Sequence, residues 1–146
     1  MATIKGQIKA ISVSATKGTP KMNVFNAELR TDYGIVGDAH AGNGYRQISL
    51  LSYESIAEVV AKGVELSPGD FAENITSEGI DLKDLKIGDK LSLNDKCELE
   101  ITQFGEHCHG RCLIYERLND SVIPREGIFA KVTKGSFINV GDQIIV

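Results

Sequence analysis

The densest group of reactive side chains in the sequence lies in one short segment, His107-Cys108-His109-Gly110-Arg111-Cys112. It holds two of the three cysteines and two of the three histidines of the chain. Imidazoles and a guanidinium beside a thiol favour the thiolate near neutral pH, and only the thiolate attacks electrophiles, carries sulfur or binds a soft metal. The segment therefore predicts a reactive cysteine, and Cys108 is the strongest candidate.

The neighbours of Cys108 suggest supporting roles. His107 or His109 would tune its protonation, and Cys112 could resolve an oxidised or persulfidated Cys108, or share a metal with it. Cys112 could instead pack beneath a short helix expected over Gly110 to Leu118, and Cys108 itself could be an inert buried thiol, as many free cysteines are. Cys97 alternates in phase with two apolar residues and is expected in the core.

The same segment resembles half of a zinc site. Structural zinc needs four converging ligands, usually supplied as two spaced pairs. The sequence has no second pair of this kind, and His40 is the remaining histidine. We therefore expect no zinc.

Three polar, turn-rich stretches are further candidates. Residues 37–44 form a glycine-rich stretch running to Arg46, whose backbone amides could hold an anion beside that guanidinium or could form a simple connector. In residues 68–75, Asn74 could bond the edge of a heterocycle or cap its own loop. In residues 124–131, Arg125 and Lys131 could face a phosphate or be solvated surface charges.

The elements that must position these residues are mostly strands. Alternating or β-branched runs predict strands over Ile4–Val13, Asn23–Leu29, Gln47–Leu51, Cys97–Thr102, Ile128–Val132 and Ser136–Val146. A helix is expected after the capping residue Ser52 and before Gly63. Gly88-Asp89 and Gly141-Asp142 each precede an apolar run and predict tight turns. Many short strands and few short helices predict a mostly β, barrel-like fold.

Length and composition narrow the function classes. The chain has 146 residues, 42% of them hydrophobic and 25% charged, with a net charge of −4. These values predict one globular domain over residues 1–146, with no charge-driven binding to nucleic acid or to a membrane. Without an apolar leader or a long apolar run, the protein is expected in the cytoplasm, where thiols stay reduced.

Taken together, several segments resemble the MOSC domain, named for the C-terminal domain of molybdenum-cofactor sulfurase. The residues that carry the resemblance are Gly37–His40, Arg46–Leu51, Gly69–Ile75, Leu85–Asp89, Thr102–Cys108 and Glu126–Val132. They span nearly the whole chain in the family's order. The chain is similar to the small stand-alone bacterial members, which lack the pyridoxal-phosphate-dependent, aminotransferase-like sulfurase domain.

The resemblance implies a barrel-like β fold, binding of the pterin-based molybdenum cofactor (molybdopterin), and one key cysteine. That cysteine matches Cys108, which would carry sulfur as a persulfide or ligate molybdenum. The family's anion- and pterin-facing positions correspond to Arg46, Asn74, Lys131 and His40. Many relatives have an Arg and a Pro before the cysteine where this chain has Phe104 to His107, and Arg111 would replace the missing cation.

Three functions remain open at this point. The first is a sulfur carrier in which Cys108 receives sulfur from a cysteine desulfurase and passes it to the molybdenum centre of an apo-molybdoenzyme. The second is a molybdenum-dependent oxidoreductase that reduces N-hydroxylated compounds. The third is a non-catalytic carrier of the cofactor.

Overall fold

The computed structural model describes residues 5–15, 21–42, 44–61, 63, 67–71, 73–80, 82–104 and 128–146. The strands are β1 Lys5–Val13, β2 Met22–Val24, β3 Asn26–Arg30, β4 Gly34–Ile35, β5 Ile48–Ser52, β6 Ile75–Glu78, β7 Lys90–Leu93, β8 Cys97–Phe104, β9 Ile128–Lys134, β10 Ser136–Asn139 and β11 Gln143–Ile145. The helix α1 spans Tyr53–Val60, and the single-turn 3-10 helices η1 and η2 span Gly44–Arg46 and Leu82–Asp84. The mostly β prediction is confirmed.

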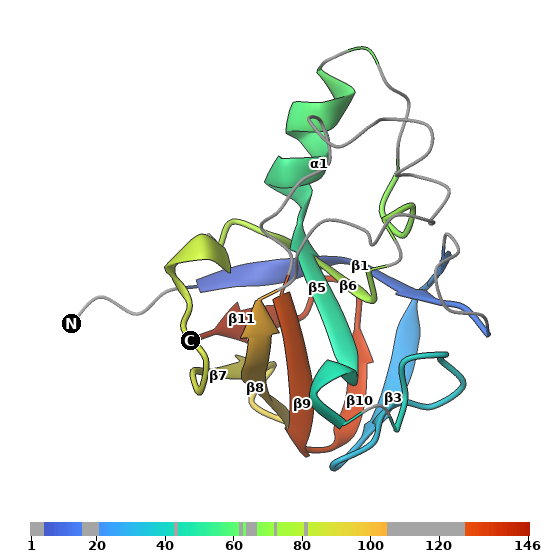
Figure 1. Cartoon of the computed structure of the whole chain (residues 1–146), viewed down its shortest axis with the longest axis vertical. Coiled ribbons are helices and arrows are strands. Elements are labelled where there is room, and N and C mark those ends of the chain that lie inside the picture. Colours follow the sequence, from blue (N-terminus) through green and yellow to red (C-terminus); the bar gives the residue numbers. More distant parts are fainter. Residues whose placement is uncertain are drawn as a thin grey trace.

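Seven strands close into a mixed barrel. Their order is β1-β11-β7-β8-β9-β5-β6, and β6 pairs with β1 again to complete the circle, while β2 extends the sheet from the other end of β1. Only the β5–β6 pair is parallel among these ladders of the described residues. A parallel pair requires a crossover, and α1 lies in the chain between the two strands, standing beyond one end of the barrel (Figure 1).

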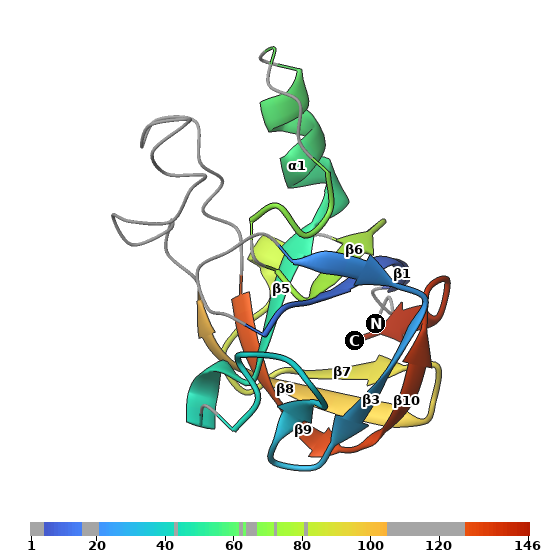
Figure 2. The same cartoon turned by 90° about the vertical axis from the view of Figure 1, so that its right-hand side faces the viewer.

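A second sheet, β10-β3-β4, shares the barrel's interior. Figure 2, turned by 90°, shows β3 and β10 beside β7, β8 and β9 around that interior. Inward-facing side chains alternate along the strands and form one continuous apolar cluster that includes Ile11, Leu50, Leu99, Ala130 and Ile138. Outward-facing positions of the same strands are left for polar and functional residues.

Several local predictions are confirmed. Ser52 caps α1, because its Oγ accepts a hydrogen bond from the backbone N of Ser55 at 3.1 Å. Gly88 and Gly141 take positive φ values of 95° and 94°. In both turns the following aspartate accepts a hydrogen bond from a backbone N three residues earlier, at 2.8 Å each, so the two Gly-Asp turns are built alike.

Other local predictions were incomplete. The run over residues 23–29 is broken at Phe25, which is 84% exposed, and the ladder restarts as β3 at Asn26. The run over residues 136–146 is two strands separated by the Gly141 turn. No strand was predicted over residues 75–78, whereas they form β6, a buried strand of the barrel. The helix expected over Gly110 to Leu118 lies outside the described residues.

Candidate functional site

The outer face of β9 carries an aromatic side chain with two basic neighbours. Phe129 lies between the inward-facing Ile128 and Ala130, so it points to the outside of the barrel. The guanidinium carbon of Arg46 lies 5.0 Å from the Phe129 ring centroid, and the His40 ring centroid lies 6.2 Å from it. We call Phe129, Arg46 and His40, together with Gln103, which bonds Arg46, the Phe129 cluster.

One nitrogen of the Arg46 guanidinium, Nε, is held by a hydrogen bond to a neighbouring strand. It lies in η1, directly before β5, and its Nε donates to Oε1 of Gln103 on β8 at 3.1 Å. Within the described residues no carboxylate pairs with it. Its remaining N–H groups are therefore able to bind an oxyanion, which a guanidinium can hold with two parallel hydrogen bonds.

Lys131 lies on the same outer face, two residues beyond Phe129 on β9. Its Nζ is 3.8 Å from Oε2 of Glu100 on β8, and the two side chains are 35% and 30% exposed. The charge of Lys131 is thus partly neutralised by a neighbour, whereas no carboxylate among the described residues neutralises that of Arg46. The structure brings Arg46, His40 and Lys131 to one face of the barrel.

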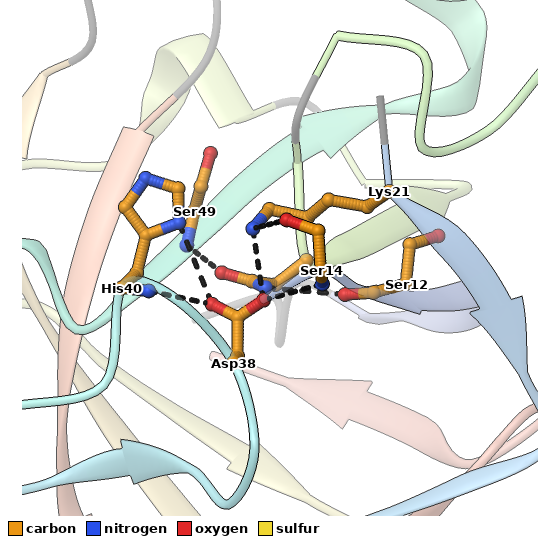
Figure 3. A network of polar contacts seen from close by, with 7 residues as sticks. Ser12, Ser14, Lys21, Asp38, His40 and Ser49 are labelled. Atoms are coloured by element: carbon orange, nitrogen blue, oxygen red, sulfur yellow. Dashed lines mark hydrogen bonds and ion pairs between the residues drawn. The ribbon is translucent and has the colours of Figure 1, made fainter. Parts of the chain in front are cut away.

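His40 is held by a buried ion pair (Figure 3). The Lys21 Nζ lies 2.8 Å from Oδ1 of Asp38, and both side chains are fully buried. Oδ1 also accepts a hydrogen bond from the backbone N of Ser14 at 3.0 Å. Oδ2 accepts one from the backbone N of His40 at 2.9 Å and lies 3.5 Å from its ring Nδ1.

These contacts keep Asp38 ionised. Burial by itself would raise the pKa of Asp38, but the interactions with His40, Lys21 and Ser14 outweigh it and hold that pKa well below its usual range. Asp38 is therefore a permanent anion at neutral pH. The sequence reading quoted Asp38 as part of the family pattern without giving it a role.

Asn74 is placed differently from the basic residues. Its side chain is fully buried, Oδ1 accepts from the backbone N of Ser49 at 2.9 Å, and Nδ2 donates to the backbone O of Ser12 at 3.1 Å. Its own backbone bonds the same two residues, since Ser12 N donates to Asn74 O and Asn74 N donates to Ser49 O. Asn74 thus joins β1 to β5 beside the start of β6, which agrees better with a structural role than with the edge of a heterocycle.

Glu73 holds the loop before Asn74. Its carboxylate accepts hydrogen bonds from the backbone N of Gly69 at 2.9 Å and of Phe71 at 3.2 Å, and from Oγ1 of Thr76 at 2.8 Å. Burial raises the pKa of Glu73 despite these donors. In this loop, the carbonyl of Gly69 accepts a hydrogen bond from the backbone N of Lys21. Gly69 has a φ of 98°, and a Cβ there would collide with the Lys21 carbonyl.

Gln47 is a structural residue that sequence reasoning missed. It is buried, its Oε1 accepts from the backbone N of Val132 at 3.0 Å, and its Nε2 donates to Asp32 at 3.1 Å. Phe129 and Gln103 were also quoted only within family segments. The period-two spacing of Phe129 and Lys131 on an expected strand was the signal that could have placed both on one face.

The predicted reactive segment lies outside the described residues. His107, Cys108, His109, Arg111 and Cys112 all belong to residues 105–127, so their predicted roles stay predictions. The strands that flank them are described, and the last residue of β8, Phe104, pairs with the first residue of β9, Ile128. The segment therefore follows β8, which carries Gln103, and precedes β9, which carries Phe129.

Cys97, by contrast, is described and inert. It is 2% exposed in the core, and burial raises its pKa to about 11, so it is a thiol at neutral pH. The core prediction for Cys97 is confirmed. Among the described residues no three His, Cys, Asp or Glu side chains converge as metal ligands, and no helix is long and apolar enough to cross a bilayer.

Solved structures share this fold at low sequence identity. YuaD from Bacillus subtilis matches with a TM-score of 0.78 and 19% identity, covering 99% of this chain and 96% of that one. YiiM from Geobacillus stearothermophilus matches with a TM-score of 0.71 and 17% identity, covering 97% and 75%. YiiM from Escherichia coli matches with a TM-score of 0.64 and 16% identity, covering 96% and 69%.

Sequence comparisons add the family. A search of curated proteins returns no significant match. The sequence model of the MOSC domain matches residues 37–145, which include β5 to β11, Asp38, the whole Phe129 cluster and Lys131. The chain therefore belongs to the MOSC domain family, which is associated with binding of the molybdenum cofactor.

Proposed function

We propose that this protein binds the molybdenum cofactor against the Phe129 cluster and handles sulfur through Cys108. The observation that carries the binding part is Arg46, a cation fixed on one side by Gln103 and without a carboxylate partner among the described residues. The family match supports the cofactor class. The sequence around Cys108 supports the sulfur chemistry.

The described residues fit such a cofactor. An anionic pterin with a phosphate needs cations and an apolar surface, and Arg46, Lys131 and the Phe129 ring offer both on one face of the barrel. Arg46 and Lys131 would hold the phosphate, and His40 would contact the bound group from the other end of the cluster. Asn74 would act indirectly, by fixing the strands that carry these side chains.

Cys108 would reach this face from the end of β8. Four peptide units separate it from Phe104, a span of no more than about 14 Å. Arg111 would supply a further cation, and His107 or His109 would favour the Cys108 thiolate. The bound cofactor would supply a molybdenum centre, a soft metal that accepts sulfur ligands.

The sulfur step balances as a thiol exchange. The Cys108 thiolate attacks the outer sulfur of a persulfide on a donor such as a cysteine desulfurase, forming a Cys108 persulfide and releasing the donor thiolate. If the Cys112 thiolate then attacks the Cys108 sulfur, a disulfide forms and the outer sulfur leaves as sulfide. Cellular thiols of the cytoplasm, where we propose that the protein acts, would reduce the disulfide again. An apo-molybdoenzyme would accept the sulfur.

The test is anaerobic purification from molybdate-fed cells, followed by molybdenum and pterin analysis and intact mass before and after cyanide. We expect bound molybdenum and pterin, together with one extra sulfur atom that cyanide removes as thiocyanate. The extra sulfur should be absent in Cys108→Ser and present in Cys97→Ala, the control at a buried thiol.

The other outcomes separate the alternatives. Retained molybdenum without removable sulfur, but with reduction of N-hydroxylated compounds, would replace sulfur transfer by an oxidoreductase function. Retained cofactor with neither property would leave a cofactor carrier. Absence of both molybdenum and pterin from the folded protein would contradict the proposal as a whole.

A further inference from the structure

The ring of His40 has two nitrogens in different surroundings. Nδ1 is buried and faces the Asp38 carboxylate at 3.5 Å, without forming a well-aligned hydrogen bond. Figure 3 shows Nε2 on the far side of the ring, pointing away from Asp38. No described residue donates to Nε2 or accepts from it, and the side chain is 13% exposed.

A neutral imidazole carries one proton, and its neighbours decide which nitrogen holds it. The ionised carboxylate of Asp38 only accepts hydrogen bonds, so it favours the proton on Nδ1. The lone pair is then on Nε2, the nitrogen that points away from Asp38, in a ring whose centroid lies 6.2 Å from that of Phe129. An acid that orients a histidine through one nitrogen, and so prepares the other nitrogen as a base, is a general arrangement for proton transfer.

The Lys21–Asp38 pair explains how this arrangement is kept. Two fully buried charges carry a large desolvation cost, so the pair adds little net stability. What it does provide is a carboxylate that stays ionised and fixed at both oxygens, by Lys21 and Ser14 on one and by the His40 backbone on the other. In the part of the chain that the structure describes, Asp38 faces the ring from its own loop and Arg46 lies across Phe129.

We propose that Nε2 of His40 is the proton acceptor of this site, with Asp38 as the positioning residue that keeps that nitrogen unprotonated. Its lone pair takes a proton from an O–H, N–H or S–H group of a ligand bound at the Phe129 cluster, and the electron pair stays on the ligand. The imidazolium that forms lies beside the Asp38 carboxylate, and the reverse step returns the proton. The identity of the ligand rests on the proposed function. The position of the proton on the His40 ring does not depend on it.

The test measures which nitrogen of the His40 ring carries the proton. Long-range proton–nitrogen NMR spectra of the ¹⁵N-labelled full chain, above neutral pH and without cofactor, distinguish the two neutral forms, and His40→Gln identifies the His40 signals. We expect the form with the proton on Nδ1 to exceed the other about tenfold in the wild type. In Asp38→Asn this excess should fall to about onefold, because the ionised acceptor is gone.

Asp32→Asn is the matched control. Asp32 is also an aspartate in a turn that accepts a side-chain hydrogen bond, and its φ of 53° suits asparagine equally well. It should leave the His40 ratio unchanged. A wild-type ring with its proton on Nε2, or a ratio that Asp38→Asn leaves unaltered, would overturn the inference. If Asp38→Asn does not fold, the wild-type ratio alone decides.

Cofactor analysis separates this inference from the proposed function. Molybdenum and pterin are measured in the wild type, because the tautomer ratio is recorded on the chain without cofactor and does not depend on cofactor binding. A wild-type protein without cofactor would contradict the proposed function while the tautomer measurement still stands.

Discussion

The polar residues of the MOSC segments occupy two regions that differ in how fully their hydrogen bonds are used. In the interior, Asn74, Glu73 and Gln47 are buried and bonded at both ends of their side chains. On the outer face of β9, Arg46 and Lys131 are partly exposed, and Arg46 has N–H groups that no described residue accepts from. Polar side chains therefore hold the barrel together in one region and are available to hold a ligand in the other.

The difference shows that the polar character of a residue does not by itself tell whether it stabilises the fold or binds a ligand. A buried amide with every hydrogen bond satisfied has nothing left for a ligand, and removing it leaves buried backbone groups without partners. A cation fixed at one end only can be removed with little harm to the fold. Substitutions in the two regions should consequently separate stability from binding.

The largest effect is expected for Asn74→Ala. The backbone N of Ser49 and the backbone O of Ser12 would lose their partners inside the protein. Each unsatisfied group costs about 1–3 kcal/mol, so the free energy of unfolding should fall by roughly 2–5 kcal/mol. Urea unfolding measures this loss.

Asn23→Ala is the control for that experiment. Asn23 is exposed and donates to Ser12 Oγ and to Pro68 O, so its loss should cost below about 1 kcal/mol. Equal losses in the two variants would show that Asn74 is not the joint between β1 and β5.

Glu73→Gln should have the next largest effect. One carboxylate oxygen would become an amide nitrogen, which cannot accept from the backbone N of Gly69 or Phe71. We expect a loss of about 1–3 kcal/mol in the free energy of unfolding. Glu54→Gln, which alters an exposed acceptor of the Gly79 N, should change stability by less than about 0.5 kcal/mol.

The pH dependence gives the same experiment a second readout. The pKa of Glu73 is raised above its usual 4.5 in the folded protein, so the folded state binds more protons than the unfolded state there. The stabilisation from this titration is complete below that usual value and is lost as the pH rises through the raised pKa. The stability advantage of the wild type over Glu73→Gln should therefore shrink with rising pH, and an advantage that grows would contradict the raised pKa.

The smallest effects are expected at the Lys131–Glu100 pair. Because both side chains are about one third exposed, Lys131→Met should change the free energy of unfolding by less than about 1 kcal/mol. It should weaken cofactor binding a few-fold, whereas Glu100→Gln should strengthen it by releasing the Lys131 charge. Equilibrium binding measures the affinity of each variant for the cofactor. Affinities that change in the same direction in both variants would exclude Lys131 as an anion contact.

The sequence predicted the barrel better than the roles of its polar residues. Short apolar or alternating runs located β5, β8 and β9, and turn chemistry located Gly88 and Gly141. Strand β6 was missed because its Thr76 and Ser77 are buried polar residues, which hide the usual alternation. Closure between β1 and β6 depends on contacts far apart in the chain, which local patterns do not carry.

The candidate site residues show the same limit of local sequence patterns. Arg46, His40 and Lys131 were singled out, and all three lie on one face. Asn74 was grouped with them because nothing in its local sequence reveals the distant Ser12 and Ser49 backbones that it bonds. The positioning role of Asp38 depends on Lys21, whose partner is likewise set by the fold.

The most direct test of this division is the molybdenum content of Arg46→Gln, purified anaerobically beside the wild type and beside Arg30→Gln, an exposed arginine paired with Glu28. Loss of a charge-assisted contact worth about 1.5–3 kcal/mol should lower cofactor affinity at least about tenfold. Arg30→Gln should match the wild type, and the melting temperatures of all three should agree within about 3 °C. A folded Arg46→Gln protein that carries as much molybdenum as the wild type would contradict the assignment of the outer face of β9 as the cofactor site.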